Sequence, residues 1–545
     1  MVKPSGLVTH SPRGRLALLG GRIRTLDDHD SVASGIAIDR GVIVAVGDDA
    51  ERALPADAPR IDLEGRTVLP GMIDAHSHVE LSTMAERLWV DVRFCEPAET
   101  VERIHRAADR AEPGAWVIAQ GTFGARLPTR GELDRAAPGH PVLVRESMHL
   151  LAASSAALAA AGIDRGYAAP LESRVLRDAD GEPTGVVREG FDLFPYPKPS
   201  VDWLAEGLPA VTRSLFVEHG VTTVYELPAS ANGMRAWQRL WREGRLPCRL
   251  TLNPILAPGH QPIVHSLDGF LELGLVTGFG DPWLRIGALK LFVDGGDFAS
   301  GFYRRQIGGP AHGWGIVNFT YPRLVGILTR CRTANVQVWM HAIGDAAQEM
   351  ALTAVEEVNR TLGEGDHRTR IEHIGNHVFD PSQLARLRDA GVIPVPNAVF
   401  IFAEEDDLAE AAPGARFYPF RTMLDHGLVT PGNSDCAGTQ PFAANPWYGI
   451  HAMLTRRTKG GAVLDPTETI DLHSAITTYT RHAAHAAFEE RSRGSLELGK
   501  LGDLVVYPDD PYKLPVDDLP GLVPDLTVIG GDVVSEAARQ SEPPA

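Results

Sequence analysis

The chain has 545 residues, which exceeds the usual size of a single domain and predicts one large domain with a smaller one. Hydrophobic residues make up 44% of it, as in ordinary globular proteins with a substantial core. The formal net charge of −18 argues against nucleic acids and anionic membranes as partners, because both attract basic surfaces. We expect a small-molecule substrate, and self-association into a homo-oligomer stays open.

Residue usage also indicates a cytoplasmic protein. The first residues, Met1–Ser5, lack the apolar stretch of a secretory signal, and no apolar run of 18 residues occurs. The four cysteines are far apart and form no C-x-x-C pair, which is typical of reduced thiols. They are Cys95, Cys248, Cys331 and Cys436.

Both ends of the chain show short strand-like runs with glycine turns. Near the N-terminus these runs lie between Leu16 and Arg66, and near the other end they are Asp503–Tyr507 and Leu526–Val534. Because neither end has enough apolar surface to bury on its own, we predict one small β-sandwich built from residues 15–66 and 494–535. Two unrelated β extensions are the alternative.

The middle of the chain alternates strand-like runs with helical patterns such as Pro381–Ala390. This alternation predicts an α/β fold, a distorted (β/α)8 TIM barrel over residues 67–493. About 145 residues separate the first two runs, which predicts an inserted subdomain at about 81–209, with strands at 116–121 and 141–144 and a hairpin around 180–185. The eight runs are Thr67–Ala75, Val221–Leu227, Cys248–Ile255, Leu284–Val293, Val336–Met340, Arg370–Ile374, Val392–Val395 and Leu428–Gly432.

Two histidines, His76 and His78, close the first of these runs. Alternate side chains of a strand point to the same face, so both imidazoles are expected to point the same way. Two convergent neutral imidazoles are half of a transition-metal site. The alternative is a turn that carries two solvated histidines.

Further potential ligands occur on other runs, at the strand ends where barrel enzymes place their chemistry. Lys290 lies in the fourth run, and His341, His373 and Asp435 follow the fifth, sixth and eighth runs. Taken singly, each has another explanation. A strand-end histidine can be a satisfied polar residue, Asp435 can be a helix N-cap, and Lys290 can belong to an ion pair. The joint pattern favours a metal site.

These motifs resemble the amidohydrolase superfamily, and within it the YtcJ-like branch that includes N-substituted formamide deformylases. The insertion adds Met148-His149, Ala153-Ser154, Ala157-Leu158 and Ala161-Gly162-Ile163, where the branch typically has Gly-His, Asn-Ser, Ala-Leu and Ala-Gly-Ile. The resemblance covers nearly the whole chain. The main matching stretches are Pro70–His78, Lys290–Gly295, His341–Asp345, Ile371–His373 and Gly494–Leu504.

The chemistry of this ligand set predicts hydrolysis of an amide-type C–N bond. His76 and His78 would hold one divalent ion, most suitably zinc, and His341 with His373 would hold a second. Lys290 would bridge the two as an N6-carboxylated lysine, because an ammonium group beside a dication is repelled. An acidified water would attack the substrate carbonyl, and Asp435 would carry its proton to the leaving nitrogen.

The insertion is expected to cover the barrel mouth and to contact the substrate through Glu146, His149 or Glu189. Ordinary surface or hairpin polar groups are the alternative for these three residues. Because one barrel supports many reactions, a lyase, decarboxylase or isomerase on the same metal site remains a second candidate. A metal-free binding protein is a third.

Overall fold

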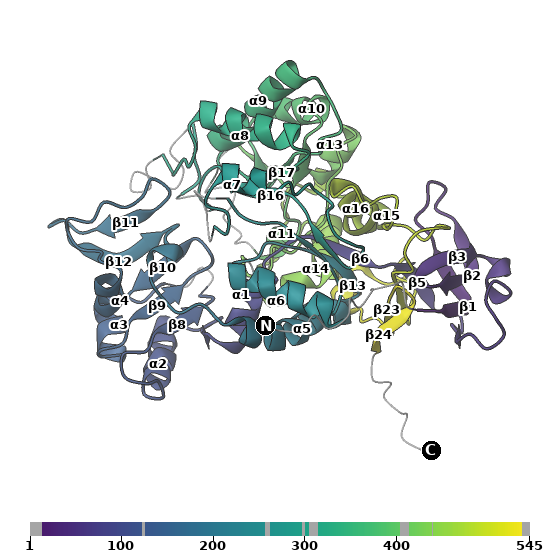
Figure 1. Cartoon of the computed structure of the whole chain (residues 1–545), viewed down its shortest axis with the longest axis horizontal. Coiled ribbons are helices and arrows are strands. Elements are labelled where there is room, and N and C mark those ends of the chain that lie inside the picture. Colours follow the sequence, from purple (N-terminus) through teal and green to yellow (C-terminus); the bar gives the residue numbers. More distant parts are fainter. Residues whose placement is uncertain are drawn as a thin grey trace.

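The computed structural model describes residues 14–122, 126–256, 262–296, 300–304, 314–403, 412, 414–438 and 440–536. Three β-rich regions lie side by side (Figure 1). A sheet built from both chain ends lies at one side, parallel strands with helices occupy the centre, and the inserted region lies at the other side. No helix in the described ranges has the length and apolar character needed to cross a membrane.

The two ends of the chain form one eight-stranded sheet, with the order β24-β23-β22-β5-β1-β2-β3 and with β4 beside β1. The C-terminal strand β22 pairs antiparallel with β5, so residues 504–507 are hydrogen-bonded directly to residues 67–70. Leu18, Val68, Leu504 and Val528 share one buried core, which therefore needs both ends of the chain. The strands are β1 (Leu16–Arg24), β2 (Val32–Asp39), β3 (Val42–Val46), β4 (Arg60–Asp62), β5 (Thr67–Pro70), β22 (Leu504–Tyr507), β23 (Leu526–Ile529) and β24 (Asp532–Glu536).

Parallel strands make up two four-stranded sheets in the centre, with the orders β15-β14-β13-β6 and β16-β17-β18-β20. The first sheet contains β6 (Met72–Ser77), β13 (Val221–Glu226), β14 (Arg249–Leu252) and β15 (Leu284–Ile286). The second contains β16 (Leu289–Phe292), β17 (Val338–His341), β18 (Arg370–Glu372) and β20 (Ile393–Val395).

Two of the predicted strands are each divided into two. The run Thr67–Ala75 breaks at Gly71, so β5 joins the terminal sheet and β6 joins the parallel strands. A Cβ at Gly71 would lie 2.2 Å from the Thr222 hydroxyl, so this crossing requires glycine. The run Leu284–Val293 breaks at residues 287–288, where the Asn253 side chain accepts the Ala288 N–H at 2.8 Å in place of a neighbouring strand.

The prediction of an eighth strand at Leu428–Gly432 is wrong, because these residues form no strand. Pro431 has no N–H to donate, and the Gly432 N–H donates to the Thr478 carbonyl at 2.8 Å instead of to a strand. The segment still runs beside β6, because the Ala75 N–H donates to Gly432 and the Asp435 N–H donates to His76, at 3.1 and 2.9 Å.

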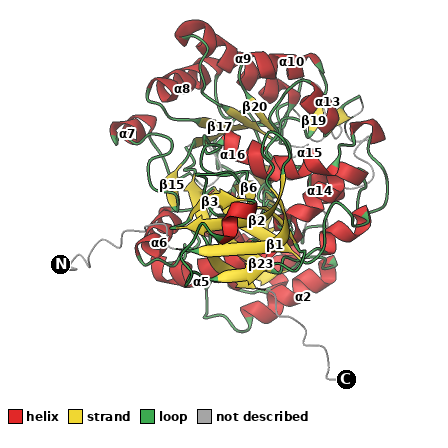
Figure 2. Ribbon diagram, turned by 90° about the vertical axis from the view of Figure 1, so that its right-hand side faces the viewer, coloured by secondary structure: helices red, strands yellow, loops and turns green. Residues whose placement is uncertain are grey.

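Helices surround the parallel strands, as Figure 2 shows from the side of the terminal sheet. Their apolar faces pack against the strands, and the predicted Pro381–Ala390 helix is confirmed as α10. The main helices of this region are α1 (Val79–Arg87), α5 (Val201–Leu215), α6 (Ala231–Arg242), α8 (Tyr321–Thr333), α9 (Asp345–Leu362), α10 (Ser382–Asp389), α13 (Phe420–Asp425), α14 (Pro446–Thr455), α15 (Leu472–Thr477) and α16 (Ala483–Ala486).

The inserted region contains a six-stranded sheet with the order β11-β12-β10-β9-β8-β7. The hairpin expected around residues 180–185 is confirmed, since β11 and β12 pair antiparallel on either side of it. The elements are β7 (Val90–Asp91), α2 (Pro97–Ala108), β8 (Val117–Gln120), α3 (Arg130–Ala136), β9 (Val142–Arg145), β10 (Leu150–Ala153), α4 (Ser155–Ala160), β11 (Arg174–Arg177) and β12 (Pro183–Arg188).

Candidate metal centre

The carboxyl ends of the parallel strands bring the predicted ligands together in the interior. The ring centroids of His76 and His78 are 5.5 Å apart, those of His76 and His373 are also 5.5 Å apart, and those of His341 and His373 are 4.6 Å apart. One potential ligand atom from each of His76, His373 and Asp435 lies within 4.8 Å of the other two. All these side chains are buried, so they form a buried cluster of residue types that bind metal ions.

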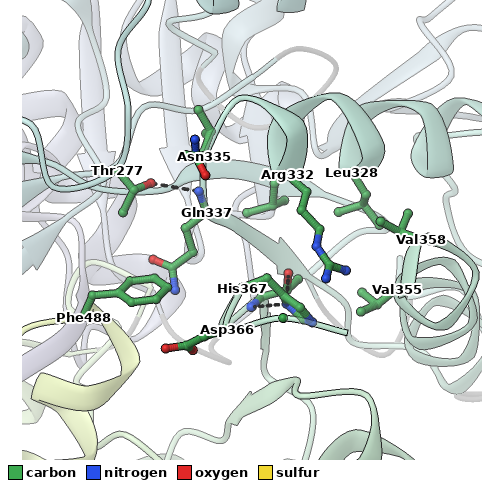
Figure 3. A pocket seen from close by; sticks show the side chains of 14 residues that line it. Thr277, Leu328, Arg332, Asn335, Gln337, Val355, Val358, Asp366, His367 and Phe488 are labelled. Carbon is green, nitrogen blue, oxygen red and sulfur yellow. Dashed lines mark hydrogen bonds between the residues drawn. The ribbon is translucent and has the colours of Figure 1, made fainter. Parts of the chain in front are cut away.

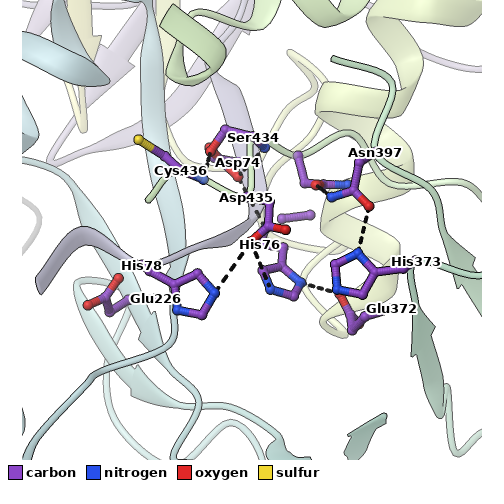
Figure 4. Close-up of polar contacts among 12 residues, drawn as sticks. Asp74, His76, His78, Glu226, Glu372, His373, Asn397, Ser434, Asp435 and Cys436 are labelled. Atoms are coloured by element: carbon purple, nitrogen blue, oxygen red, sulfur yellow. Dashed lines mark hydrogen bonds and ion pairs between the residues drawn. The ribbon is translucent and has the colours of Figure 1, made fainter. Parts of the chain in front are cut away.

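The buried carboxylate of Glu372 orients the ring of His76 (Figure 4). Its Nδ1 lies 2.5 Å from Oε2 of Glu372, and Arg370 donates two hydrogen bonds to the same carboxylate, at 2.7 and 2.8 Å. Burial disfavours the charged carboxylate, but Arg370 and His76 hold the pKa of Glu372 below its usual range. With Nδ1 bound in this way, Nε2 of His76 is left to act as a metal ligand.

His373 is oriented in a similar way by Asn397. The Nδ1 atom of His373 lies 2.7 Å from Oδ1 of Asn397, whose own amide donates to Asn433 at 2.7 Å. The backbone of His373 has a φ of 70°, an uncommon value for a residue with a side chain. Its N–H donates to the Val395 carbonyl at 2.9 Å, so this conformation is fixed by the neighbouring strand β20.

The carboxylate of Asp435 faces the two histidines at the end of β6, His76 and His78. Its Oδ1 lies 3.4 Å from Nε2 of His78 and 3.6 Å from Nε2 of His76. Its φ of 49° is also left-handed, and the bond from its N–H to the His76 carbonyl holds it there. Burial disfavours the carboxylate, but the nearby histidines hold the pKa of Asp435 well below its usual value. Asp435 is therefore ionised at neutral pH.

Gly432, three residues before Asp435, allows this approach. A Cβ at Gly432 would lie 2.5 Å from the ring of Tyr479. The φ of Gly432 is not positive, so its backbone conformation does not require glycine. The requirement at this position is therefore close packing against Tyr479.

Lys290 is completely buried on β16, and its Nζ has no hydrogen-bond partner among the described residues. Burial lowers the pKa of this amine to about 8. A buried lysine nitrogen without a partner is costly unless it is modified or paired with a group that the protein binds. A carboxylated Lys290 would fit this position, because its carboxylate would lie beside the histidines and would hold a metal ion there.

His341, at the end of β17, has its Nε2 3.3 Å from the Gly295 carbonyl. When Nε2 carries the proton for that bond, Nδ1 is left as the lone-pair atom. The nearby Asp294 accepts the N–H groups of Phe302, Ile343 and Gly344 at 2.7–3.0 Å, so it fixes the start of α9 directly after His341.

Comparisons with known proteins agree with this geometry. A family model described as the Amidohydrolase family matches residues 60–535. The chain belongs to the amidohydrolase family. The N-substituted formamide deformylase of Arthrobacter pascens is 27% identical over 94% of this chain and 96% of its own length. The YtcJ protein of Bacillus subtilis (strain 168) is 25% identical over 95% of this chain and 98% of its own length.

The solved structures agree at the level of the fold. An uncharacterized metal-dependent hydrolase from Pyrococcus horikoshii OT3 has a TM-score of 0.72 and 22% identity, and the match covers 92% of this amidohydrolase and 99% of that chain. The predicted family and the predicted reaction class, metal-dependent hydrolysis of carbon–nitrogen bonds other than peptide bonds, are confirmed.

The inserted region of this amidohydrolase brings two of its three candidate residues to the centre. The ring centroid of His149 lies 5.8 Å from that of His341, and Nδ1 of His149 lies 2.9 Å from Oε2 of Glu189. The other oxygen of Glu189 accepts the Gly296 N–H at 2.9 Å and the Ser300 hydroxyl at 2.8 Å. Glu189 thus joins the insertion to the loop after β16. Glu146 lies three residues before His149, and its N–H donates to the Leu150 carbonyl at 2.9 Å.

Three supporting residues were not predicted from the sequence: Glu226, Glu372 and Asn397. Glu226, at the end of β13, accepts the N–H groups of Val79 and Glu80 at 2.6 and 3.0 Å and so fixes the start of α1 directly after His78. Glu226 and Glu372 are completely buried carboxylates on strands, which is costly without partners. The cost of burying these two carboxylates is the feature of the sequence that could have identified them as supporting residues. No comparable feature of the sequence identifies Asn397.

Proposed function

We propose that this amidohydrolase hydrolyses the amide bond of a small molecule, with one or two zinc ions held at the strand ends. The observation that supports this most directly is the convergence of His76, His373 and Asp435, whose potential ligand atoms lie within 4.8 Å of one another. Imidazole nitrogens and carboxylate oxygens suit zinc. His78 and His341 adjoin this group. The proposed ligands are His76, His78, Lys290, His341 and His373, and Asp435 lies beside them as the proposed proton carrier.

The architecture that we propose is a distorted (β/α)8 barrel covering residues 67–493, with a β-sandwich formed by the terminal sheet. Hydrogen bonds at both gaps between the two parallel sheets support a closed ring. At one gap the Lys290 N–H donates to Pro254 and the Leu256 N–H donates to Lys290, each at 2.9 Å. At the other gap the segment 432–436 exchanges backbone bonds with β6, and the side chain of Asn433 donates to the Pro396 carbonyl, directly after β20, at 3.0 Å. In such barrels the active site lies at the carboxyl ends of the strands.

Lys290 is proposed to be carboxylated at Nζ. Its neutral amine would attack carbon dioxide, form an N–C bond and release one proton, which leaves an anionic carboxylate in place of a cation. Complete burial, the absence of a hydrogen-bond partner among the described residues and a pKa lowered to about 8 support this modification. The product would supply oxygen ligands between the two histidine pairs. A divalent metal bound there polarises an amide carbonyl and acidifies a water molecule.

Asp435 is proposed to carry the proton. It is ionised at neutral pH, and it faces Nε2 of both His76 and His78. Its carboxylate would accept the proton of the attacking water and return it to the nitrogen of the leaving amine. The hydrogen bond from its N–H to the His76 carbonyl holds the backbone of Asp435 beside that histidine.

The insertion is proposed to cover the substrate. Glu189 orients His149, and the ring of His149 packs closely over Gly296, where a Cβ would lie 2.0 Å from it. These contacts support the proposal that His149 contacts the substrate beside His341, with Glu189 as its positioning residue and Glu146 as a further candidate on the same loop. The Arthrobacter pascens relative makes N-substituted formamides the first substrates to test.

The test uses zinc-loaded protein with N-formyl, N-acyl and cyclic amides in ¹⁸O-labelled water. We expect one label in the carboxylic acid product, because hydrolysis takes its oxygen from water. Conversion without label would show a lyase or isomerase instead. The His76→Ala/His78→Ala variant should lose at least one equivalent of metal and its turnover, whereas His105→Ala/His140→Ala in the insertion should lose neither. Full metal retention in the first variant would overturn the site.

The cellular setting is also a proposal. A net charge of −18 and four free cysteines support a cytoplasmic protein that acts on a small molecule without nucleic acid or membrane as a partner. Self-association is to be tested by sedimentation of the zinc-loaded protein.

A further inference from the structure

A cavity of about 470 Å³ lies at the opposite end of the strands from the metal centre. Val338, the first residue of β17, lines it, whereas His341, the last residue of that strand, belongs to the metal centre. Three strand residues span about 10 Å, so the two sites are separate. Cavities of this size are typical of those that hold small organic ligands.

Apolar side chains from two helices form much of the wall (Figure 3). Leu328 comes from α8, Val355 and Val358 come from α9, and Phe488 follows α16 on the other side. Leu328, Val355 and Val358 are buried, whereas Phe488 is 37% exposed, so Phe488 offers most of the apolar surface of this wall that a ligand would remove from water.

One guanidinium, that of Arg332, lies in this apolar surrounding. It donates to the side-chain oxygen of Asn359 and to the carbonyl of Gly363, which are both neutral acceptors. Within the described part of the chain it has no carboxylate at ion-pair distance, and burial lowers its pKa. Arg332 is thus a partly buried cation whose charge is not compensated by a neighbouring acid.

The other ionisable groups of the cavity are already engaged. The carboxylate of Asp366 is bound by Arg368 through two hydrogen bonds, at 2.8 and 2.9 Å, and points away from Arg332 in Figure 3. The ring nitrogens of His367 lie 2.8 Å from the Thr369 hydroxyl and 3.0 Å from the Ala390 carbonyl, and burial lowers the pKa of this histidine. His367 is therefore neutral, and Arg332 is left as the group that can recognise a charged ligand.

We propose that this cavity is a second ligand site that binds a small organic acid with an apolar body. The carboxylate of the ligand would accept hydrogen bonds from Arg332, and its hydrocarbon part would lie against Leu328, Val355 and Phe488. A guanidinium matches a carboxylate in both charge and shape. The site is independent of the proposed hydrolysis, because none of these residues belongs to the metal centre.

Calorimetric titration of the zinc-loaded full chain with hexanoate, and with 1-hexanol as a neutral counterpart that has no amide bond to hydrolyse, tests this proposal. We expect saturable binding of hexanoate, at least tenfold tighter than that of 1-hexanol. Hexanoate could also bind zinc, so the titration is repeated with the His76→Ala/His78→Ala variant, which should bind it equally well. Absence of saturable binding to the unaltered chain, or its loss in that variant, would overturn the proposal.

Variants then locate the carboxylate. Arg332→Gln should weaken hexanoate binding at least tenfold and remove its advantage over 1-hexanol. Arg332→Lys, which keeps the charge, should retain part of that advantage. The control Arg360→Gln changes an exposed arginine of α9 and should bind as the parent does. Leu328→Trp narrows the cavity and should weaken both ligands, with folding checked by circular dichroism. Equal binding by the parent and Arg332→Gln would place the acid elsewhere.

Discussion

Nδ1 of His76 lies 2.5 Å from Oε2 of Glu372, and both side chains are buried. Glu372 directly precedes His373 in the chain, so two consecutive residues act on the same centre in different ways. His373 offers a ring nitrogen to the centre, whereas Glu372 orients the histidine of another strand. Arg370 stacks 3.5 Å from the ring centroid of Trp339 and binds Glu372, which fixes the carboxylate in turn.

The first prediction concerns this orienting carboxylate. Glu372→Gln should lower metal affinity by roughly 10–100-fold, the usual effect of removing such a partner of a histidine ligand. The amide is neutral, so it neither stabilises the His76 ring as a donor nor balances Arg370. Competition with a chromophoric chelator measures the affinity. The control Glu490→Gln removes a partly exposed partner of Arg368 and should leave the affinity unchanged. Equal affinities in the parent and Glu372→Gln would contradict the orienting role.

The second prediction concerns Lys290. Lys290→Ala should lose turnover and bound metal, and added acetate or propionate should restore part of both, because a free carboxylate can occupy the vacated space. Methylammonium chloride, which supplies a cation instead, should restore neither. After incubation with ¹³CO₂, the parent should show a carbamate carbon in its NMR spectrum that Lys290→Ala lacks. A parent spectrum without that signal would show that the amine is unmodified.

Which residues of this centre could be predicted from the sequence depends on how far apart the interacting residues lie in the chain. His76 and His78 were recognisable because strand alternation is a local property, and Lys290 because a cation in an apolar run is costly wherever the run folds. The pairing of Glu372 with His76 joins residues 296 positions apart, and no local pattern contains it. Asn397 was missed for the same reason, since its side chain is selected by the ring of His373.

The fold shows the same limit. The apolar runs were correctly located, but residues 67–75 read as one strand because nothing within that run shows that β22 will pair with its first half. The break at 287–288 depends on the side chain of Asn253, and the irregular backbone of residues 428–432 depends on Pro431 and Thr478. Tertiary partners, rather than local propensity, decided these boundaries.

The third prediction concerns pH and Glu226. Burial raises the pKa of this carboxyl to about 8 from an ordinary 4.5. Between those values the folded protein retains a proton that the unfolded chain has released, so the contribution of this group to stability is lost as the pH rises from 4.5 to 8. Glu226→Gln carries no charge and should escape that loss. Its urea midpoint should therefore rise relative to that of the parent between pH 5 and pH 8.

The matched control for this experiment is Glu132→Gln. Hydrogen bonds from Arg126 lower the pKa of Glu132 to about 2, so this residue stays ionised in the folded protein throughout that pH range. The difference between Glu132→Gln and the parent should be nearly constant from pH 5 to pH 8. If the difference in urea midpoint between Glu226→Gln and the parent were also constant from pH 5 to pH 8, Glu226 would not retain its proton in the folded protein.

The last prediction concerns Asp435. If this residue carries the proton, Asp435→Asn should keep near-normal zinc content and lose roughly 10²–10⁴ in turnover, because an amide cannot accept a proton from water. If it served only as a ligand, the same variant would mainly lose metal. The control Asp517→Asn alters a carboxylate that also contacts a histidine, at 3.2 Å, but lies on the surface, and it should change neither quantity. Turnover of Asp435→Asn within about tenfold of the parent, measured at full zinc occupancy, would assign the proton transfer to another residue, and His373 would be tested next.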